Sequence, residues 1–303
     1  MGLEGGGFVA QAAALCRACD GSTDPRFQKR GFSFVTCREC GVISVADPLP
    51  DTVDYDASYF SESSVNGYAA YVADRDLIEA NFAARLVWLQ SFTAGGRLLD
   101  VGAAYGFFVH LAARAGFAAQ GLEPAADCAA FARQELGAEL QTGRIESVDL
   151  PDESFDVVTM FDVLEHFENP RVALQQAARL LRPGGLLVVE TGDTEALLAR
   201  LAQQRWYFFD PPQHLVFFSQ ANLAQLARSV GFGDALGVGH IGRQVSLRNF
   251  SFQLSRALGG RRGALLRRFG ESTWGQSRFR VPDRGNAFIM AFRRETRPES
   301  SLR

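Results

Sequence analysis

Four of the five cysteines form two closely spaced pairs near the start of the chain. The pairs are Cys16-x-x-Cys19 and Cys37-x-x-Cys40, with 17 residues between them. Four thiolates at this spacing are typical of a tetrahedral zinc site, and such a site is structural because it leaves no coordination position for a substrate. Two disulfides are the alternative, which a reducing compartment disfavours. The sequence therefore predicts a structural zinc-ribbon or zinc-knuckle module over residues 16–45.

A second group of residues has the spacing of a nucleotide site. Asp100, Gly102 and Gly106 lie in the sequence DVGAAYG, between an apolar strand at 97–101 and a helix. In doubly wound sheets this turn is where nucleotides bind, and glycine allows the backbone to come close to the ligand. Glu123 ends the next apolar segment, where a carboxylate can accept hydrogen bonds from both hydroxyls of a ribose. Together these residues predict a bound nucleotide or nucleoside.

Apolar strands alternate with amphipathic helices over most of the chain. Strands are expected at 97–101, 117–122, 155–161, 186–190 and 287–292. Helices are expected after the glycine turn, after Asn169 with Pro170, and after Ser219, because these residue types begin helices. The sequence RPGG at 182–185 is expected to be a turn. Strand–helix units of this kind build parallel sheets, so the predicted fold class is α/β with a doubly wound, mostly parallel sheet.

Four segments resemble, in order and spacing, the successive motifs of class I S-adenosylmethionine (SAM)-dependent methyltransferases. They are LLDVGAAYGFF, GLEP, LPDESFDVVTMFDVLEHFENP and LLRPGGLLVVET, within about residues 95–235. The resemblance implies a Rossmann-like sheet of seven strands and SAM as the cofactor. Ala104 stands where the family usually has the middle glycine of its first motif. The resemblance also implies that the cofactor is held by Asp100, Gly102, Ala104, Gly106, Glu123, Pro124, Phe161 and Asp162, with residues 143–146 beside the adenine.

A nicotinamide-dependent dehydrogenase is the nearest alternative for this turn. Such an enzyme needs G-x-G-x-x-G, whereas the turn here reads G-A-A-Y-G. The later LRPGG–strand pair is also absent from that pattern. The sequence therefore favours the methyltransferase.

Two histidines are expected on the acceptor side of the site. His166 lies just after the strand at 155–161, and His214 lies in the aromatic, proline-containing segment 206–215. An imidazole with an ordinary pKa of about 6.5 can take a proton at neutral pH. We expect these histidines to act as a base or to contact the acceptor. A loop contact for His166 and an aromatic core position for His214 are the structural alternatives.

The chain divides into four expected segments. They are a flexible Gly/Ala-rich terminus (1–15), the zinc module (16–45), a linker with a helical lid (46–92) and the methyltransferase domain (93–303). Aromatic faces favour a cation, so rings in the third segment could cover the sulfonium of the cofactor. Packing of a helix onto the sheet is the alternative role for these rings, which are Tyr55, Tyr59, Phe60, Tyr68 and Tyr71.

The net charge of −3 conceals an uneven distribution. Residues 243–303 hold 14 Arg and 4 acidic residues, a balance of +10, which leaves −13 for the rest of the chain. A basic helical insertion is expected at about 246–282. It could cover the acceptor site, rest on a membrane that carries a lipid-linked glycan, or face an RNA. A solvated, salt-bridged surface is the plainest alternative.

The composition excludes two classes of protein. Hydrophobic residues make up 47% and charged residues 21%, which supports an ample core and excludes disorder over the whole chain. No segment approaches the roughly 18–20 apolar residues of a membrane span. The start of the chain is a poor secretory signal. A cytoplasmic location is therefore expected.

These observations predict a SAM-dependent methyltransferase that methylates a hydroxyl or a carbon of a small molecule or sugar-containing metabolite. Similar four-cysteine segments occur in some sugar C-methyltransferases, which keeps glycans among the candidate substrates, phosphorylated or lipid-linked forms included. An RNA methyltransferase is the alternative, with the zinc module and the basic region holding nucleic acid. A regulator that binds the cofactor without catalysis is the third hypothesis. SAM and structural Zn²⁺ are the expected cofactors.

Overall fold

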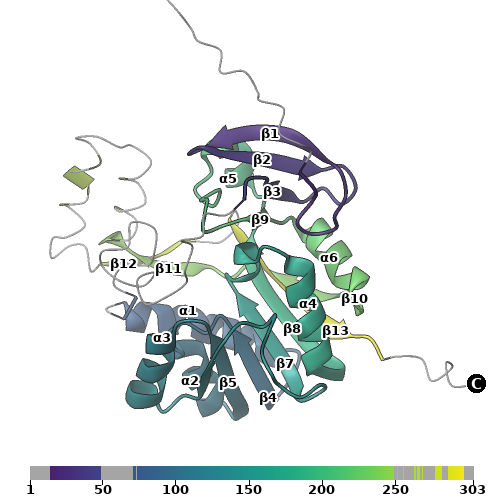
Figure 1. Cartoon of the computed structure of the whole chain (residues 1–303). Helices are drawn as coiled ribbons and strands as arrows, with labels where there is room; N and C mark the ends of the chain where they lie inside the picture. The colour runs from purple at the N-terminus through teal and green to yellow at the C-terminus, as the bar shows by residue number, and fades with distance from the viewer. Residues whose placement is uncertain are drawn as a thin grey trace, which may run out of the picture.

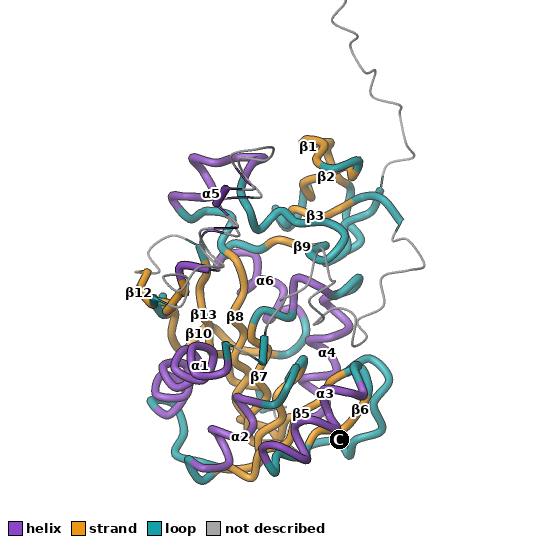
Figure 2. Tube along the Cα trace, turned by 90° about the vertical axis from the view of Figure 1, so that its left-hand side faces the viewer, coloured by secondary structure: helices purple, strands orange, loops and turns teal. Residues whose placement is uncertain are grey.

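The computed structural model describes residues 14–48, 71–72, 74–248, 277–281 and 286–296, and positions 251, 255, 263, 265, 266 and 268. Figures 1 and 2 show its elements. The strands are β1 (Thr23–Lys29), β2 (Phe32–Cys37), β3 (Ile43–Val45), β4 (Gly96–Val101), β5 (Phe117–Glu123), β6 (Leu140–Thr142), β7 (Phe155–Phe161), β8 (Leu181–Gly192), β9 (Val216–Phe217), β10 (Phe232–Gly239), β11 (Arg243–Ser246), β12 (Arg278–Val281) and β13 (Ala287–Arg294). The helices are α1 (Arg75–Gln90), α2 (Phe107–Arg114), α3 (Ala126–Phe131), α4 (Pro170–Leu180), α5 (Leu197–Ala202) and α6 (Gln220–Ser229), with short π or 3₁₀ turns η2 (Ala132–Leu136), η3 (Leu164–His166) and η4 (Gln203–Arg205).

The central sheet has seven strands in the order β10-β13-β8-β7-β4-β5-β6. Neighbouring strands from β8 to β6 are parallel, whereas β13 runs antiparallel to both β8 and β10. The order reverses at β4, which pairs with β5 on one side and with β7 on the other. The predicted α/β class with a doubly wound, mostly parallel sheet of seven strands is therefore confirmed.

Side chains alternate between the two faces of this sheet, because successive residues of a strand point in opposite directions. Leu187 and Val189 pack in the buried cluster that includes residues of α4 and α6. Leu186 and Val188 pack in the cluster that includes residues of α1 and α2. Helices therefore cover both faces, as Figure 1 shows, and the strands between them are almost wholly apolar.

The predicted helix starts at Asn169 and Ser219 are confirmed. The Asn169 side chain accepts a hydrogen bond from the Val172 N–H, and the Ser219 hydroxyl accepts one from the Asn222 N–H. The predicted turn at 182–185 is wrong, because these residues belong to β8. The strand continues through an irregularity in its pairing with β7, and Gly184 accommodates it with a φ of 76°.

The cysteine-bearing segment forms a sheet with β9, a strand from much later in the sequence. The order is β1-β2-β3-β9, and Ile43 of β3 pairs with Phe217 of β9. Immediately after β9, Phe218 bridges to Asp193, which follows the carboxyl end of β8. This four-stranded sheet, at the top of Figure 1, therefore lies beyond the carboxyl ends of the central strands.

An aromatic cluster joins this small sheet to the segment that carries His214. Phe34 of β2 packs against Phe209 and Phe217, with ring centroids 5.4 and 5.6 Å apart. Trp206 is buried in the same cluster and stacks on Phe208 at 5.1 Å. The segment 206–217 is therefore fixed by packing on the N-terminal sheet.

Two expected features fall largely outside the described residues. One is the linker with the expected aromatic lid, since residues 49–70 are not described and with them Tyr55, Tyr59, Phe60 and Tyr68. The other is the predicted basic insertion at 246–282, most of which is not described either. Tyr71 is described, and its ring stacks on Tyr105 of the glycine turn at 5.6 Å. No described helix has both the length and the apolar character that crossing a membrane requires.

Candidate active site at the carboxyl ends of the central strands

Asp100 is a buried carboxyl at the end of β4. The Thr159 hydroxyl of the neighbouring strand β7 donates a hydrogen bond to Asp100 Oδ1 at 2.6 Å. Burial, together with the nearby charge of Glu123, raises the pKa of Asp100 to about 7 although the Thr159 bond opposes the shift. Asp100 is therefore a carboxyl whose ionisation at neutral pH is easily changed by a nearby charge.

Glu123 is a buried carboxylate at the end of β5 and is held by two backbone amides. The Ala104 N–H donates to Oε2 at 2.9 Å, and the Ala125 N–H donates to Oε1 at 3.1 Å. Burial raises the pKa of Glu123, while these amide bonds lower it. Pro124, the next residue, is half-buried. The residue predicted to bind the ribose thus also ties the glycine turn to β5.

The glycine turn has the backbone shape that its residue types imply. Gly102, Ala104 and Gly106 have φ angles of 71°, 46° and 77°, in the left-handed region where glycine is favoured. A Cβ on Gly102 would lie 2.5 Å from Val163 Cγ2, and one on Gly106 would lie 2.9 Å from Ala132 Cβ. Close packing within the protein therefore requires both glycines, in addition to any ligand.

The predicted adenine segment at 143–146 lies next to Glu123. The Gly143 N–H donates to the Glu123 backbone oxygen at 3.0 Å. The positive charge of Arg144 acts on the Glu123 carboxylate. The structure thus brings Asp100, the turn, Glu123 and this segment together at the carboxyl ends of β4 and β5.

Phe161 and Asp162, predicted near the sulfonium, point to different surroundings. The Phe161 ring is buried edge-on against Phe108 of α2, with centroids 4.8 Å apart. Asp162 has a φ of 54° and accepts hydrogen bonds on both carboxylate oxygens from one nitrogen of Arg243, at 2.7 and 2.8 Å. Burial would raise the pKa of Asp162, but Arg243 holds it below its usual range.

Sequence reasoning missed the ion-pair network around Asp162. Arg243 also donates to Glu190 Oε1 at 2.8 Å, and Arg85 of α1 donates to both oxygens of Glu190 at 2.5 Å. The Arg85–Glu190 pair is almost completely buried. One signal was present, since Arg85 lies next to Leu86 and four residues before Leu89 on the apolar face of its helix. Buried arginines generally need an acidic partner.

The rings of His166 and His214 lie next to each other. His166 also contacts the backbone of Gln213, which lies 47 residues further along the chain. The two ring centroids are 4.9 Å apart, with the planes at 78°. His166 Nδ1 is 2.7 Å from the Gln213 oxygen, and His214 Nδ1 is 2.7 Å from the Phe208 oxygen. Burial and the neighbouring His214 lower the pKa of His166 to about 3, so this imidazole is uncharged at neutral pH.

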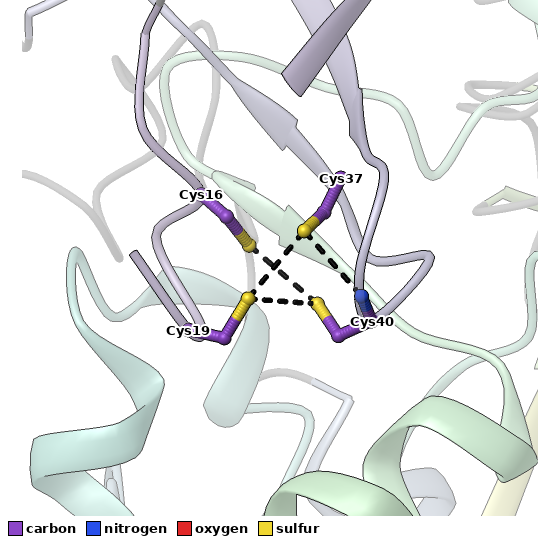
Figure 3. Close-up of side chains that lie close together, drawn as sticks. All are labelled: Cys16, Cys19, Cys37 and Cys40. Atoms are coloured by element: carbon purple, nitrogen blue, oxygen red, sulfur yellow. Dashed lines mark hydrogen bonds between the residues drawn. The ribbon is translucent and has the colours of Figure 1, made fainter. Parts of the chain in front are cut away.

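The four cysteines converge as a zinc site requires (Figure 3). The Sγ atoms of Cys16 and Cys40 are 3.6 Å apart, and Cys19 Sγ is 3.4 Å from those of Cys37 and Cys40. Around a zinc ion with Zn–S bonds of about 2.3 Å, tetrahedral sulfurs lie about 3.8 Å apart. Backbone N–H groups of Ala18 and Cys40 also point at sulfurs, at 3.4 Å. The donor set and its geometry fit zinc.

Comparison with known proteins identifies the domain. Residues 73–234, just over half of the chain, match the family model described as "Methyltransferase domain". This chain belongs to that methyltransferase family. The predicted resemblance is thereby confirmed, and the matched range contains the glycine turn, Glu123, Asp162 and both histidines of the site.

Curated relatives share part of this methyltransferase. A ubiquinone biosynthesis O-methyltransferase of Xanthomonas oryzae pv. oryzae (strain PXO99A) is 38% identical over 104 residues, which cover 32% of this chain and 44% of that enzyme. A demethylmenaquinone methyltransferase of Tropheryma whipplei (strain Twist) is 39% identical over 100 residues, covering 32% and 42%. The chain thus spans less than half the length of these relatives.

A solved structure shares the fold of this methyltransferase. A SAM-dependent methyltransferase of Thermotoga maritima superposes with a TM-score of 0.50 at 22% identity, covering 74% of this chain and 97% of that one. At this identity the likeness concerns the fold.

Proposed function

We propose that this methyltransferase transfers a methyl group from SAM to an oxygen of a small organic acceptor. The observation that carries the proposal is the juxtaposition of Asp100 and Glu123 at the carboxyl ends of two adjacent parallel strands. The Ala104 N–H joins the turn after the first strand to the Glu123 carboxylate at 2.9 Å. Open α/β sheets bind nucleotides at the carboxyl ends of their strands, at the point where the strand order reverses.

The donor set at these strand ends fits SAM. Each Glu123 oxygen accepts one amide bond and keeps a lone pair for a further donor, and a ribose offers two hydroxyl donors. Asp100 places a second carboxyl nearby, whose ionised form would favour the ammonium and sulfonium charges of the ligand. When bound, SAM supplies an electrophilic methyl group.

The neighbouring end of β7 supplies the acceptor side. In transfer to a hydroxyl, the oxygen–methyl bond forms while the methyl–sulfur bond breaks, the electron pair goes to sulfur, and the hydroxyl proton must leave. His166 lies just after the end of β7 and its ring packs against that of His214, with Nδ1 of each ring 2.7 Å from a backbone oxygen. We infer that this pair contacts the acceptor and promotes the loss of its proton.

Acceptors with a ring hydroxyl are the first class to test. The curated relatives named above act, by their names, in ubiquinone biosynthesis and on demethylmenaquinone. A sugar hydroxyl remains a prediction from the sequence, as does a nucleic-acid acceptor, since most of the basic segment 246–282 lies outside the described residues. The cytoplasmic location also remains a prediction.

Zinc at the four cysteines is part of the proposal. Its role would be structural, because the four thiolates fill the tetrahedral positions. The zinc module would act on the reaction indirectly, through β9 and the aromatic cluster that hold the segment before His214 in place.

Transfer of labelled methyl groups from SAM tests this function. The zinc-loaded chain would be offered hydroquinones and catechols, sugar nucleotides, and a short RNA in parallel. We expect label in a ring-hydroxyl acceptor, and a loss of rate of about 10²–10⁴-fold in His214→Ala, the magnitude of general acid–base assistance. His240→Ala is the matched control, because its Nδ1 also contacts a backbone oxygen, that of Ala287 at 3.0 Å. Transfer to the RNA alone would contradict the proposal.

A further inference from the structure

Arg243 of β11 holds a guanidinium next to the carboxyl end of β7. The hydrogen bonds that it makes within the described residues all come from Nη2, two to the oxygens of Asp162 and one to Glu190 Oε1, at 2.7, 2.8 and 2.8 Å. A guanidinium has five N–H groups, so those on Nε and Nη1 are not used by these bonds. We propose that Arg243 binds a carboxylate of the acceptor and so selects acceptors that carry one, an inference that rests on the proposed function.

Electrostatic interactions place Arg243 close to the segment that carries His214. Burial would raise the pKa of Asp162, but positive charges that include those of Arg243 and His214 hold it below its usual range. Burial would lower the pKa of Arg243, but negative charges that include Asp162 and an ionised Tyr207 raise it well above its usual value. Tyr207 and His214 belong to the same aromatic segment. The Arg243–Asp162 pair therefore lies within electrostatic reach of the residues assigned to the acceptor.

The position of the Arg243 guanidinium is fixed from α1. Arg85 of α1 donates to both oxygens of Glu190 at 2.5 Å, and Glu190 in turn accepts from Arg243. The Asn81 side chain of α1 accepts from the Gln244 N–H at 2.7 Å and donates to the Gln244 oxygen at 3.0 Å. These bonds hold the backbone next to Arg243. A cation that is already held in place loses little conformational freedom when a ligand binds.

The unused donors distinguish Arg243 from an arginine that only stabilises the fold. Arg85 is such an arginine, since its side chain is 3% exposed and its Nε, Nη1 and Nη2 all donate hydrogen bonds. Arg243 is 36% exposed, and its buried Nε has no hydrogen-bond partner among the described residues. A buried donor without a partner lowers stability. The guanidinium is therefore only partly satisfied by the protein, and a ligand can reach its exposed part.

The charges around Arg243 favour an acceptor group with a single negative charge. The two arginines of the network balance its two carboxylates, Asp162 and Glu190. Burial, together with the charge of Asp162, raises the pKa of Glu165 to about 8, so this carboxyl mostly keeps its proton at neutral pH. A phosphate dianion would add two negative charges here, whereas a carboxylate adds one. Hydrogen bonds to a carboxylate are about twice as strong as those to a neutral oxygen. The network thus fits a hydroxy acid.

Two acceptors that differ by one charge test this inference. A dihydroxybenzoate and its carboxamide have the same ring and hydroxyls and nearly the same shape. Calorimetric titration of each into the zinc-loaded chain, saturated with S-adenosylhomocysteine, measures binding without methyl transfer. We expect the acid to bind at least about tenfold more tightly than the amide, which is the lower limit for a hydrogen bond to a charged group.

Two substitutions at Arg243 separate recognition from folding. Arg243→Gln removes the guanidinium and should abolish the preference for the acid. Arg243→Lys keeps a positive charge beside Asp162 but loses the planar set of N–H groups, so it should reduce the preference while preserving the fold. The matched control is Arg182→Gln, because Arg182 is also partly exposed and donates to Asp156 Oδ1 at 2.8 Å, at the amino end of β8. The control should keep the preference, and unchanged affinity for S-adenosylhomocysteine shows that a variant is folded.

The outcomes distinguish this inference from the proposed function. Binding of the acid no tighter than that of the amide would overturn the inference. A preference that persists unchanged in both Arg243 variants would also overturn it. Transfer of labelled methyl groups, measured on the same samples, tests the function separately. Transfer without a preference for the acid would leave the function standing, whereas preferential binding of the acid without any transfer would keep the carboxylate site and contradict the function.

Discussion

The Glu123 carboxylate accepts a hydrogen bond from the Ala104 N–H at 2.9 Å, across 19 residues of sequence. This bond connects the two elements that the site needs, the turn after β4 and the end of β5. The other oxygen of the Glu123 carboxylate accepts a hydrogen bond from the Ala125 N–H at 3.1 Å, which also fixes the start of α3. One side chain thus shapes the turn and presents a carboxylate at the place where a ribose is expected.

Glu123→Gln should weaken SAM binding by about 10–100-fold. The amide keeps the shape of the side chain, but its NH₂ group cannot accept from a backbone N–H or from a ribose hydroxyl, and a hydrogen bond to a charged group contributes about 1.5–3 kcal/mol. Calorimetric titration of SAM measures the change. The control is Glu139→Gln, an exposed residue of the same region. Equal affinities for the two variants would contradict the ribose assignment.

Asp100→Asn should change the pH dependence of stability. The folded-state pKa of Asp100 is raised to about 7 from an ordinary 3.8, so the folded chain holds a proton that the unfolded chain has lost. Stability is therefore lost as pH rises towards 7. Relative to Asp100→Asn, the free energy of unfolding of the wild type should fall by about 2 kcal/mol between about pH 5.5 and 7.5. Urea denaturation at both values measures it, and a parallel pH dependence in the two proteins would contradict the raised pKa.

Arg85→Met should destabilise the fold by about 3–5 kcal/mol, because it leaves the buried Glu190 with less compensating charge. The matched control is Arg228→Met, which removes an exposed ion pair to Asp234 of 3.0 Å. Pairs of that kind contribute about 0–1 kcal/mol. Urea denaturation of both variants compares them. Similar small effects would show that Arg85 and Glu190 contribute little.

Removal of zinc, by a chelator or by Cys40→Ser, should disturb the acceptor side more than the cofactor side. The module reaches the reaction centre through β3, β9 and the aromatic cluster around Trp206. We expect a red shift of tryptophan fluorescence and loss of methyl transfer, with SAM affinity changed much less. Cys128→Ala is the control, since Cys128 is buried elsewhere and burial raises its pKa to about 12. Unchanged fluorescence after complete zinc loss would contradict the link between the module and the site.

The features that depend on nearby residues could be predicted from the sequence. The glycine turn, Glu123 at its strand end and the two cysteine pairs each lie within one or two elements, so their spacing reports their geometry. The alternation of strands and helices likewise indicated the doubly wound sheet. The helix starts at Asn169 and Ser219 could be predicted because a cap is a contact over three residues.

Contacts between distant segments could not be predicted. Arg243 and Asp162 are 81 residues apart, and Arg85 and Glu190 are 105 apart, so no spacing rule connects them. Their meeting depends on how α1 and β11 pack against the central sheet. The same holds for β9, whose two residues join the cysteine module to the domain. The two histidines were each expected near the acceptor, but the contact between their rings could not be predicted.

SAM binding to the zinc-loaded chain tests the central claim most directly. Calorimetry should show one SAM per chain with micromolar affinity, and S-adenosylhomocysteine should compete for the same site. The same titration on Glu123→Gln should give much weaker binding. A folded chain that carries zinc and binds neither compound would contradict the assignment of this site to methyl transfer from SAM.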